Sequence, residues 1–336
     1  MHLTTIVLFS ILISFTALGQ NEKKKSLVKW YTFEEAVKLQ EQQPKTLFID
    51  MYTDWCGWCK VMDTTTFVHP QIANYINTHF YPVKFNAERK DTVIYKGKTY
   101  TNTGEGRRPP HQLAVELLRG KMSYPTIVYI DDNWNVNPLS GYMPPEKIES
   151  FLVYFAERIN RSAPHEDFNK NYTELIRNKK KNPELIKWYT FPEALDLNSK
   201  NPKKVLVSIY SDFNHGSKVL NNACLNHPVI AKYINEHYYP VKIQAEMTDT
   251  VVVGEQVFIN EQKIQNYPHQ LPIALLQGQL FYPTLLFLDK DNKIMNRAPG
   301  YMTARDLETV LNFIGGDNFL NQEWEQYKQN FVSQIQ

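Results

Sequence analysis

An internal repeat limits the folds open to this chain more than any other feature of its sequence. The segment KWYTF occurs at positions 29–33 and again at positions 187–191, an offset of 158. Between positions 67–88 and 225–246, fourteen of twenty-two residues are identical. A chain of 336 residues is also longer than one average domain. We therefore expect two domains that share one fold.

Within each copy, apolar patterns typical of strands and of helices alternate along the chain. In the first copy they predict helices at 33–42, 70–78, 111–118 and 145–159, and strands at 46–53, 81–85, 125–130 and 136–139. A hairpin is expected at 92–101 around Lys96-Gly97. Strands that alternate with helices predict an α/β fold, in which helices flank a central mixed sheet.

The repeat and the local composition divide the chain into segments. The predicted domains are residues 26–162 and 184–316, and residues 163–183 form a linker that is expected to contain a helix. After residue 317, apolar residues recur at helical spacing and predict a closing helix at 317–336 (Leu320, Trp324, Tyr327 and Phe331). This helix is expected to cover a hydrophobic face of its own chain, and binding of a partner is the alternative.

The N-terminal segment has the pattern of an export signal. The apolar run from Ile6 to Leu18 is too short for a comfortable membrane span, but it suits the core of a signal peptide. We expect residues 1–19 to form this signal, with cleavage after Gly19. No Lys or Arg precedes the run, and an uncleaved anchor is the alternative. Because no cysteine follows at a lipobox position, the sequence predicts a periplasmic or secreted protein without a lipid anchor.

The stretch LFIDMYTDWCGWCKVM at positions 47–62 contains two cysteines two residues apart. Its first half has the pattern of a buried strand, and a helix is expected to begin at Cys56. Free N–H groups at a helix start stabilise a thiolate, so Cys56 is the expected nucleophile. Cys59 lies one turn further along the same helix face, where it can resolve a mixed disulfide formed by Cys56.

These residues resemble the thioredoxin family. Positions 55–60 read WCGWCK and match its W-C-x-x-C-K motif, although Gly-Trp replaces the usual Gly-Pro between the cysteines. The resemblance is to secreted and periplasmic thioredoxin-like reductases, including the C-terminal domain of the thiol:disulfide interchange protein. It implies tandem thioredoxin-like domains, each with an inserted hairpin. It also implies that Asp50 is a buried carboxylate and that Tyr124-Pro125 contains a cis bond opposite the thiols.

The resemblance implies a thiol-disulfide oxidoreductase with no cofactor beyond the redox-active disulfide Cys56-Cys59. Such an enzyme would reduce or isomerise disulfide-containing proteins. An electron-donating thiol partner, which could be membrane-embedded, would then recharge it. Asp50 would help to deprotonate Cys59, because burial raises the pKa of a carboxyl group towards the range of a general base. The alternative is that Asp50 ends its strand and faces water.

The expected substrate-binding residues surround the nucleophile. Trp55 and Trp58 would present flat apolar surface beside the thiol, although either could instead only pack on its own domain. By the same resemblance, the backbone of Tyr124 and the ring of Pro125 would hold the substrate peptide. These four residues complete the site that we predict around Cys56.

The two copies differ at the predicted site. DWCGWCK at 54–60 becomes DFNHGSK at 212–218, with two matches in seven positions. Asn214 and Ser217 replace the cysteines, and Ser208 replaces Asp50. The thiols and the carboxylate disappear together while the surrounding frame is kept, so we expect a degenerate second domain. Its Tyr282-Pro283 groove could still bind a peptide or could pack on the first domain.

Other classes of function are weakly supported. Lys plus Arg number 37 against 35 for Asp plus Glu, so no broad positive field favours nucleic acid. With three cysteines and one close pair, neither a structural disulfide framework nor a zinc site is expected, and Cys224 is predicted to be a buried free thiol. The remaining rival is a non-catalytic scaffold that binds peptides or proteins through the second domain.

Overall fold

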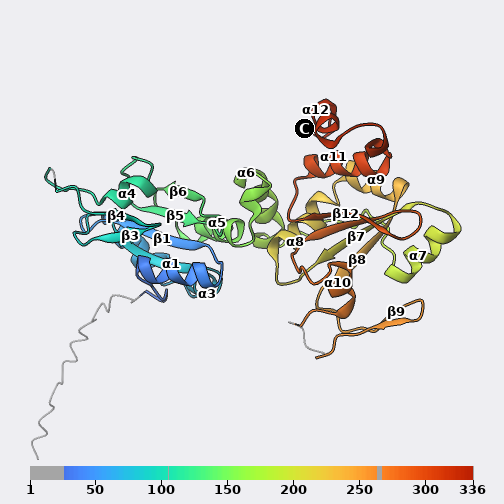
Figure 1. The fold of residues 1–336 in the computed structure, drawn as a ribbon, viewed down its shortest axis with the longest axis horizontal. Coiled ribbons are helices and arrows are strands. Elements are labelled where there is room, and N and C mark those ends of the chain that lie inside the picture. Colours follow the sequence, from blue (N-terminus) through green and yellow to red (C-terminus); the bar gives the residue numbers. More distant parts are fainter. Residues whose placement is uncertain (1–25, 105, 263–266, 336) are drawn as a thin grey trace, which may run out of the picture.

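The computed structural model describes residues 26–104, 106–262 and 267–335. The predicted signal peptide at 1–19 lies outside these residues. Figure 1 shows two α/β units at the left and right, with helix α6 (His165–Tyr172) between them. Both units present the same order of elements, so the expectation of two α/β domains with one fold is confirmed.

The elements of the first domain agree closely with the sequence patterns. They are α1 (Phe33–Gln42), β1 (Leu47–Tyr52), α2 (Gly57–Thr65), α3 (Pro70–His79), β2 (Tyr81–Asn86), β3 (Val93–Tyr95), β4 (Lys98–Tyr100), α4 (Gln112–Leu117), β5 (Thr126–Ile130), β6 (Val136–Ser140) and α5 (Pro145–Ala156). The last helix ends three residues before its predicted end at 159. Arg158 has a φ of 59°, a left-handed conformation that stops the helix before a 3-10 turn, Ile159–Arg161.

The central sheet of the first domain has the strand order β2-β1-β5-β6. β1 runs parallel to β2 and antiparallel to β5, and β5 pairs antiparallel with β6, so the sheet is mixed as expected. The strands β3 and β4 form a separate hairpin. β1 is therefore a central strand with partners on both sides, and the loop at its end leads directly into α2.

Apolar side chains fill both faces of this sheet. Phe33 of α1, Ile49 and Leu113 of α4 belong to the core on one face. Phe48 of β1 and Met62 of α2 belong to the core on the other face. Because successive side chains of a strand point to opposite faces, residues 48, 50 and 52 face α2. The path of β1 therefore places Asp50 under the helix that follows it.

The second domain repeats this arrangement. Its elements are α7 (Phe191–Lys200), β7 (Lys204–Tyr210), α8 (His215–Val219), α9 (Pro228–His237), β8 (Tyr238–Gln244), β9 (Val251–Val253), β10 (Gln256–Phe258), α10 (Gln270–Leu275), β11 (Thr284–Leu288), β12 (Ile294–Pro299) and α11 (Ala304–Gly315). The sheet order is β12-β11-β7-β8, and β9 pairs with β10 as a hairpin. A π-helical turn, Leu220–Cys224, continues α8.

The linker packs as part of the fold. The expected helix is present as α6, followed by a π-helical turn at Thr173–Arg177. Phe168 of α6 is fully buried and meets Tyr301 of the second domain at a ring-centroid distance of 5.5 Å. Buried residues of both domains and of α6 form one continuous apolar cluster. The two domains are therefore packed against each other.

A carboxylate from the first domain caps a helix of the second. Glu157 follows α5, and its side chain is 9% exposed. Its Oε1 accepts a hydrogen bond from the backbone N–H of His215 at 2.9 Å, and its Oε2 accepts one from Gly216 at 2.6 Å. These N–H groups begin α8, where a helix has free donors and partial positive charge. The start of α8 thus lies inside the domain interface.

The C-terminal segment forms a shorter helix than expected. α12 covers Trp324–Asn330, whereas Leu320 lies in a 3-10 turn and is 71% exposed. The rings of Trp324 and Tyr327 pack on Phe313 of α11 at 5.2 and 5.1 Å. The helix therefore covers an apolar part of its own chain, but the prediction that it extends over 317–336 was wrong.

Cys224 is buried, as the sequence predicted. It is a free cysteine with 1% exposure, and its Sγ lies 3.3 Å from the hydroxyl of Tyr301. Burial raises the pKa of the Cys224 thiol to about 12. The thiol thus behaves as a small apolar side chain of the core.

The cap on α8 generates the first prediction. Glu157→Gln removes the negative charge but keeps the side-chain size, so it should weaken the two hydrogen bonds and the interaction with the helix terminus. We expect the free energy of unfolding to fall by about 1 to 3 kcal/mol, as measured by urea denaturation. Glu149→Gln is the control, because Glu149 is 42% exposed in its pair with Arg177. Equal stability of the two variants would contradict the role given to Glu157.

Candidate active site

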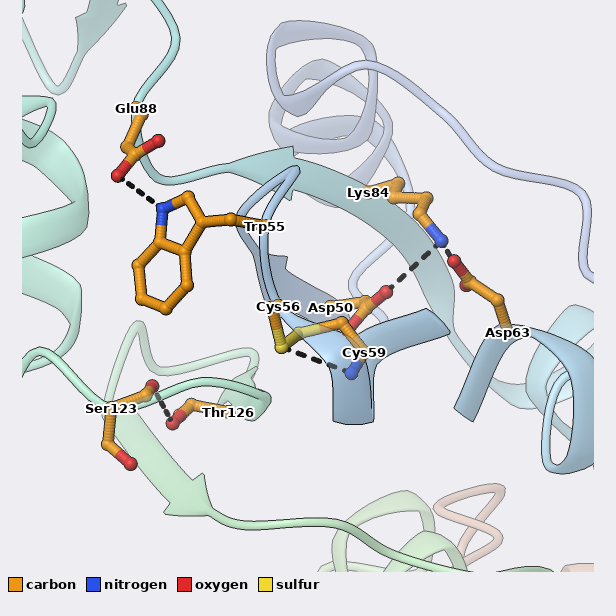
Figure 2. Close-up of a disulfide and its surroundings, with 9 residues drawn as sticks. All are labelled: Asp50, Trp55, Cys56, Cys59, Asp63, Lys84, Glu88, Ser123 and Thr126. Atoms are coloured by element: carbon orange, nitrogen blue, oxygen red, sulfur yellow. Dashed lines mark hydrogen bonds and ion pairs between the residues drawn. A yellow bond between two sulfur atoms is a disulfide. The ribbon is translucent and has the colours of Figure 1, made fainter. Parts of the chain in front are cut away.

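The two motif cysteines lie at the start of α2. Cys56 is the N-cap residue, and its Sγ accepts a hydrogen bond from the backbone N–H of Cys59 at 3.1 Å. Cys56 and Cys59 form a disulfide with a Cα–Cα distance of 5.3 Å. Figure 2 shows this disulfide at the end of the helix. The expected helix start and disulfide reach are therefore both present.

Aromatic side chains border the disulfide. Cys56 is 5% exposed and Cys59 is 3% exposed, whereas Trp55 is 48% and Trp58 is 61% exposed. The residues directly before Cys56 and directly before Cys59 therefore expose large apolar side chains. Large exposed apolar groups of this kind are typical of sites that bind other molecules. Both tryptophans also contact their own domain, Trp55 through Tyr124 and Trp58 through Tyr142, so their role in binding stays a prediction.

Trp55 is held in place while half of it remains exposed. Its Nε1–H donates to Glu88 at 2.8 Å, and its ring meets that of Tyr124 at 5.9 Å in an edge-on contact. The guanidinium of Arg108 lies 4.5 Å from the centre of the Trp55 ring. Arg108 comes from the polar loop after the hairpin. The loop thus forms part of the rim of the site.

The loop before β5 contributes the next part of the rim. Tyr124-Pro125 is a cis peptide bond, and the equivalent Tyr282-Pro283 of the second domain is also cis. Thr126 donates its hydroxyl to the carbonyl of Ser123 at 2.8 Å, which closes the loop around the cis bond. Figure 2 shows these two flanking residues. The ring contact between Tyr124 and Trp55 connects this loop to the segment that carries the cysteines.

Asp50 is a buried carboxylate beneath α2. Its side chain is 2% exposed, and its Oδ2 lies 3.4 Å from the Nζ of Lys84 on β2. Lys84 also pairs with Asp63 on α2, so the amine bridges the strand and the helix (Figure 2). The Oδ1 atom of Asp50 is buried and has no hydrogen-bond partner in the part of the chain that the structure describes. The expectation of a buried carboxyl group is confirmed, and the alternative of a residue facing water is wrong.

The environment of Asp50 raises its pKa to about 7. Burial is the largest cause, because a charged carboxylate loses its hydration. Lys84 acts in the opposite direction, since its positive charge favours the ionised form, and the negative charge of Asp63 raises the pKa further. A carboxyl group with this pKa can accept and release a proton near neutral pH.

In the second domain, uncharged side chains without a thiol stand in place of the two cysteines and the two aspartates of the site. The lysine is kept. Asn214 caps α8, and its Oδ1 accepts from the backbone N–H of Ser217 at 2.7 Å, as Cys56 accepts from Cys59. Ser208 occupies the position of Asp50, and its hydroxyl donates to Asn221 at 2.8 Å. Lys242 replaces Lys84 and keeps its contact with the equivalent tryptophan, since Lys84 lies over Trp30 and Lys242 over Trp188, but among the described residues it has no ion pair with a carboxylate. The frame of the site is kept while its acid and thiol groups are lost.

Sequence analysis missed Lys84 and Asp63. Comparison of the copies contained the signal for both, because Lys84 is kept as Lys242, and Asp63 changes to Asn221 along with the change of Asp50 to Ser208. Position 63 lies three residues beyond the motif segment 54–60. Their contact could not be foreseen from spacing alone, since it depends on how α2 crosses β2.

The groove of the second domain packs on the first domain. Glu157 caps the start of α8, and the Arg158 guanidinium lies 5.6 Å from the centre of the Phe281 ring, directly before the cis bond at Tyr282-Pro283. Sequence analysis left open whether this groove binds a peptide or packs on domain one. The structure shows packing at the helix start, whereas beside the proline loop Arg158 contacts Phe281 at the edge of an open pocket.

The described residues contain no group of three or more His, Cys, Asp or Glu side chains arranged to hold a metal ion. Over the same part of the chain, no helix has both the length and the apolar character needed to cross a membrane.

Two family models match the chain. Residues 18–161 match Thioredox_DsbH, described as a protein of unknown function, DUF255, and residues 191–315 match Thioredoxin_2, described as a thioredoxin-like domain. The chain is a tandem of two thioredoxin-like domains. The resemblance drawn from the WCGWCK motif is therefore confirmed, and the second match covers the domain that lacks the cysteine pair.

Relatives of this thioredoxin-like tandem are distant. An uncharacterised protein of Caenorhabditis elegans is 23% identical over 189 residues, which cover 55% of this chain and 22% of that protein. The thiol:disulfide interchange protein DsbD of Photorhabdus laumondii is 22% identical over 133 residues, 39% of this chain and 20% of DsbD. The tandem thus matches about a fifth of the length of either relative. The solved structure of a putative disulphide-isomerase from Bacteroides thetaiotaomicron is 27% identical, with a TM-score of 0.28, and the match covers 39% of this chain and 93% of that chain.

The buried carboxyl group generates the second prediction. In the unfolded chain Asp50 titrates near pH 4, whereas in the folded domain its pKa is about 7. The folded state therefore retains a proton that the unfolded state releases, so stability falls as pH rises from about 4 to 7 and levels off above. Asp50→Asn removes this loss, and we expect it to be more stable than the parent at pH 8 by about 2 to 4 kcal/mol.

Urea denaturation of the disulfide-bonded protein at pH 4, 6 and 8 measures this difference. The advantage of Asp50→Asn should be small at pH 4 and should grow towards pH 8. Asp54→Asn, a change at an exposed position, provides the control and should show no such trend. An advantage that is constant across the three pH values would refute the titration assigned to Asp50.

Proposed function

We propose that the first domain is an exported thiol-disulfide oxidoreductase that reduces or isomerises protein disulfides. One observation carries the proposal: Cys56 caps the start of α2, is bonded to Cys59, and is bordered by two exposed tryptophans. A helix N-terminus stabilises a thiolate, and a second thiol one turn away can accept the covalent intermediate. The printed names of DsbD and of the putative disulphide-isomerase agree with this class of reaction.

The proposed reaction proceeds in two exchanges. The Cys56 thiolate attacks one sulfur of a substrate disulfide, so a bond from Cys56 to the substrate forms and the second substrate sulfur leaves as a thiolate. The Cys59 thiolate then attacks the Cys56 sulfur, which forms the Cys56-Cys59 disulfide and releases the first substrate sulfur. Two electrons pass to the substrate. In isomerisation, a substrate thiolate displaces Cys56 before Cys59 acts.

Asp50 would act on the second exchange. The proton of the Cys59 thiol must leave before its sulfur can attack, and a carboxylate beneath the same helix is a suitable acceptor. The raised pKa of Asp50 matches this role, because such a group can take up a proton at neutral pH and return it later. Lys84 would hold the carboxylate in position through its contacts with Asp50 and Asp63.

The substrate would bind across the aromatic rim. Trp55 and Trp58 offer exposed apolar surface next to the disulfide, and Tyr124 and Pro125 form the adjoining loop. A peptide that lies along this loop could form backbone hydrogen bonds with Tyr124 while its own side chains contact the indoles. The preferred partners are therefore proteins with an accessible disulfide flanked by apolar residues.

Export and recharging complete the proposal. The signal pattern at residues 1–19 supports a periplasmic or secreted location, where disulfides persist. Each reduction leaves the Cys56-Cys59 disulfide oxidised, so a thiol partner must supply two electrons before the next turnover. The partner would have to reach Cys56 through the same aromatic rim. No other cofactor is needed for the chemistry of the pair.

The scaffold alternative has less support. It requires a groove in the second domain that a peptide can enter along the helix start, but Glu157 of the first domain occupies that helix start. We therefore do not advance it as a second function. In this proposal the second domain packs against α5 of the first domain and α6 of the linker.

A trapping experiment tests the proposed reaction. Cys59→Ala leaves the nucleophile but removes the resolving thiol, so mixed disulfides should accumulate on Cys56 and disappear on treatment with a reductant. Non-reducing gels followed by mass spectrometry would detect them. The matched control is the double variant Cys56→Ala/Cys59→Ala, which should trap nothing. Disulfide reductase activity that survives Cys56→Ala would contradict the proposal.

A kinetic experiment tests the role of Asp50. In Asp50→Asn we expect the resolution step to slow at least tenfold at pH 7, because the acceptor for the Cys59 proton is lost. The first exchange, followed by alkylation of Cys56, should change much less. The deficit should shrink as pH rises, since hydroxide can then deprotonate Cys59. Equal slowing of both steps at every pH would point to a structural defect instead.

A further inference from the structure

A cavity of about 510 Å³ lies between the two domains, away from the motif cysteines. Arg158 and Arg161 of the first domain line one part of it, and Arg297 of β12 lines another. Leu276, Phe281 and Pro299 of the second domain contribute apolar lining. Its volume is within the range of pockets that bind small molecules. The cavity therefore combines apolar walls with positively charged groups from two domains.

Two of the three arginines already have carboxylate partners. Arg158 pairs with Asp132 at 2.8 Å, and Arg161 pairs with Asp132 and, at 3.8 Å, with Asp131. Both arginines follow α5 and both aspartates follow β5. The ion pairs therefore hold the two guanidinium groups against the end of β5. The Arg158 guanidinium also lies over the ring of Phe281, which positions it beside the apolar wall.

Arg297 differs from the other two. Its Nε is buried without a hydrogen-bond partner, and within residues 26–104, 106–262 and 267–335 its guanidinium has no ion pair. A buried polar atom without a partner is costly, and a missing ligand is one of its ordinary explanations. Each N–H of a guanidinium can only donate a hydrogen bond. The group that satisfies Arg297 must therefore be an acceptor, and a negative charge would suit it best.

The repeat offers an internal comparison for these residues. Arg297 lies opposite Leu286 in the sheet, and in the first domain Pro138 lies opposite Val128 at the equivalent place. Phe281 corresponds in sequence to Ser123. Neither the arginine nor the phenylalanine is thus a requirement of the shared fold. Both belong specifically to the side of the second domain that faces the cavity.

We propose that this cavity binds a small organic monocarboxylate with an apolar body. The three arginines carry three positive charges and their two aspartate partners carry two negative charges, so one positive charge is left for the ligand. A guanidinium fork matches the two oxygens of a carboxylate. The apolar body would lie against Phe281 and Leu276. This site is separate from Cys56, and the inference does not rest on the proposed redox function.

Calorimetric titration of the full chain, with its disulfide intact, tests the inference. N-acetyl-L-phenylalanine is the probe, because it carries one carboxylate and an aromatic body. N-acetyl-L-phenylalanine amide has the same shape without the charge, and inorganic phosphate has more charge without the apolar body. We expect the acid to bind at one site, at least tenfold more tightly than either comparison compound.

Variants of a single arginine assign the binding to this cavity. Arg297→Gln should weaken binding of the acid at least tenfold, whereas Arg297→Lys, which keeps the charge but loses the fork, should give an intermediate affinity. Arg305→Gln, a change at an exposed position of α11, should bind as the parent does. Circular dichroism and alkylation of reduced Cys56 verify that each variant is folded.

Several results would overturn the inference. They are an absence of binding by the parent protein, equal binding of acid and amide, or an unchanged affinity in Arg297→Gln. Tighter binding of phosphate than of the acid would replace the monocarboxylate with a phosphate ligand. If Arg297→Gln does not fold, the comparison of acid with amide on the parent and on Arg297→Lys still decides the question.

Discussion

The structure depends on the free N–H groups at the start of the helix that follows the first central strand, which is α2 in the first domain and α8 in the second. These N–H groups have different acceptors in the two domains. In the first domain the sulfur of Cys56 caps α2 and accepts the N–H of Cys59. In the second domain the carboxylate of Glu157 accepts the first N–H groups of α8. Both are acceptors that gain from the positive end of a helix. One backbone feature therefore supports a disulfide in one copy and a domain interface in the other.

This difference agrees with the absence of a cysteine pair from the second copy. A thiol at the start of α8 would face Glu157, whose negative charge disfavours a thiolate. A side chain larger than hydrogen at position 216 would also come within 3.1 Å of the same carboxylate. The glycine and the carboxylate are thus fitted to each other. Packing against the first domain requires a buried helix start with a carboxylate acceptor, whereas thiol-disulfide exchange requires an accessible helix start that stabilises a thiolate. The start of α8 has the first arrangement.

The acidic groups at α2 also differ between the two domains. Burial of Asp50 costs stability, and a purely structural domain would gain by replacing it with a neutral residue. The second domain has Ser208 and Asn221 in place of Asp50 and Asp63, and the Ser208 hydroxyl donates a hydrogen bond to the Oδ1 of Asn221. Retention of a costly carboxyl group only beside the cysteines agrees with the role that we propose for Asp50.

The sequence alone predicted most of the fold because its signals are local. Period-two and helical apolar patterns placed the strands and helices of the first domain to within one residue, apart from the end of α5. That end escaped prediction because the apolar pattern continues to Ile159, while Arg158 takes a left-handed conformation that no pattern records. The closing helix was overextended for a related reason. Its apolar spacing includes Leu320, which the structure leaves exposed outside the helix.

Some residues of the site were predicted from the sequence, and others were found only in the tertiary structure. The cysteines, Asp50 and the cis-proline loops could be read from a short motif and from the repeat, since each lies at a defined place along the chain. Lys84 reaches Asp50 from a neighbouring strand, and Arg108 reaches Trp55 from a distant loop. Glu157 meets α8 only because α6 and the shared core turn the domains towards each other. Sequence determined which elements form, whereas contacts between residues far apart were decided by packing, whose geometry no local pattern contains.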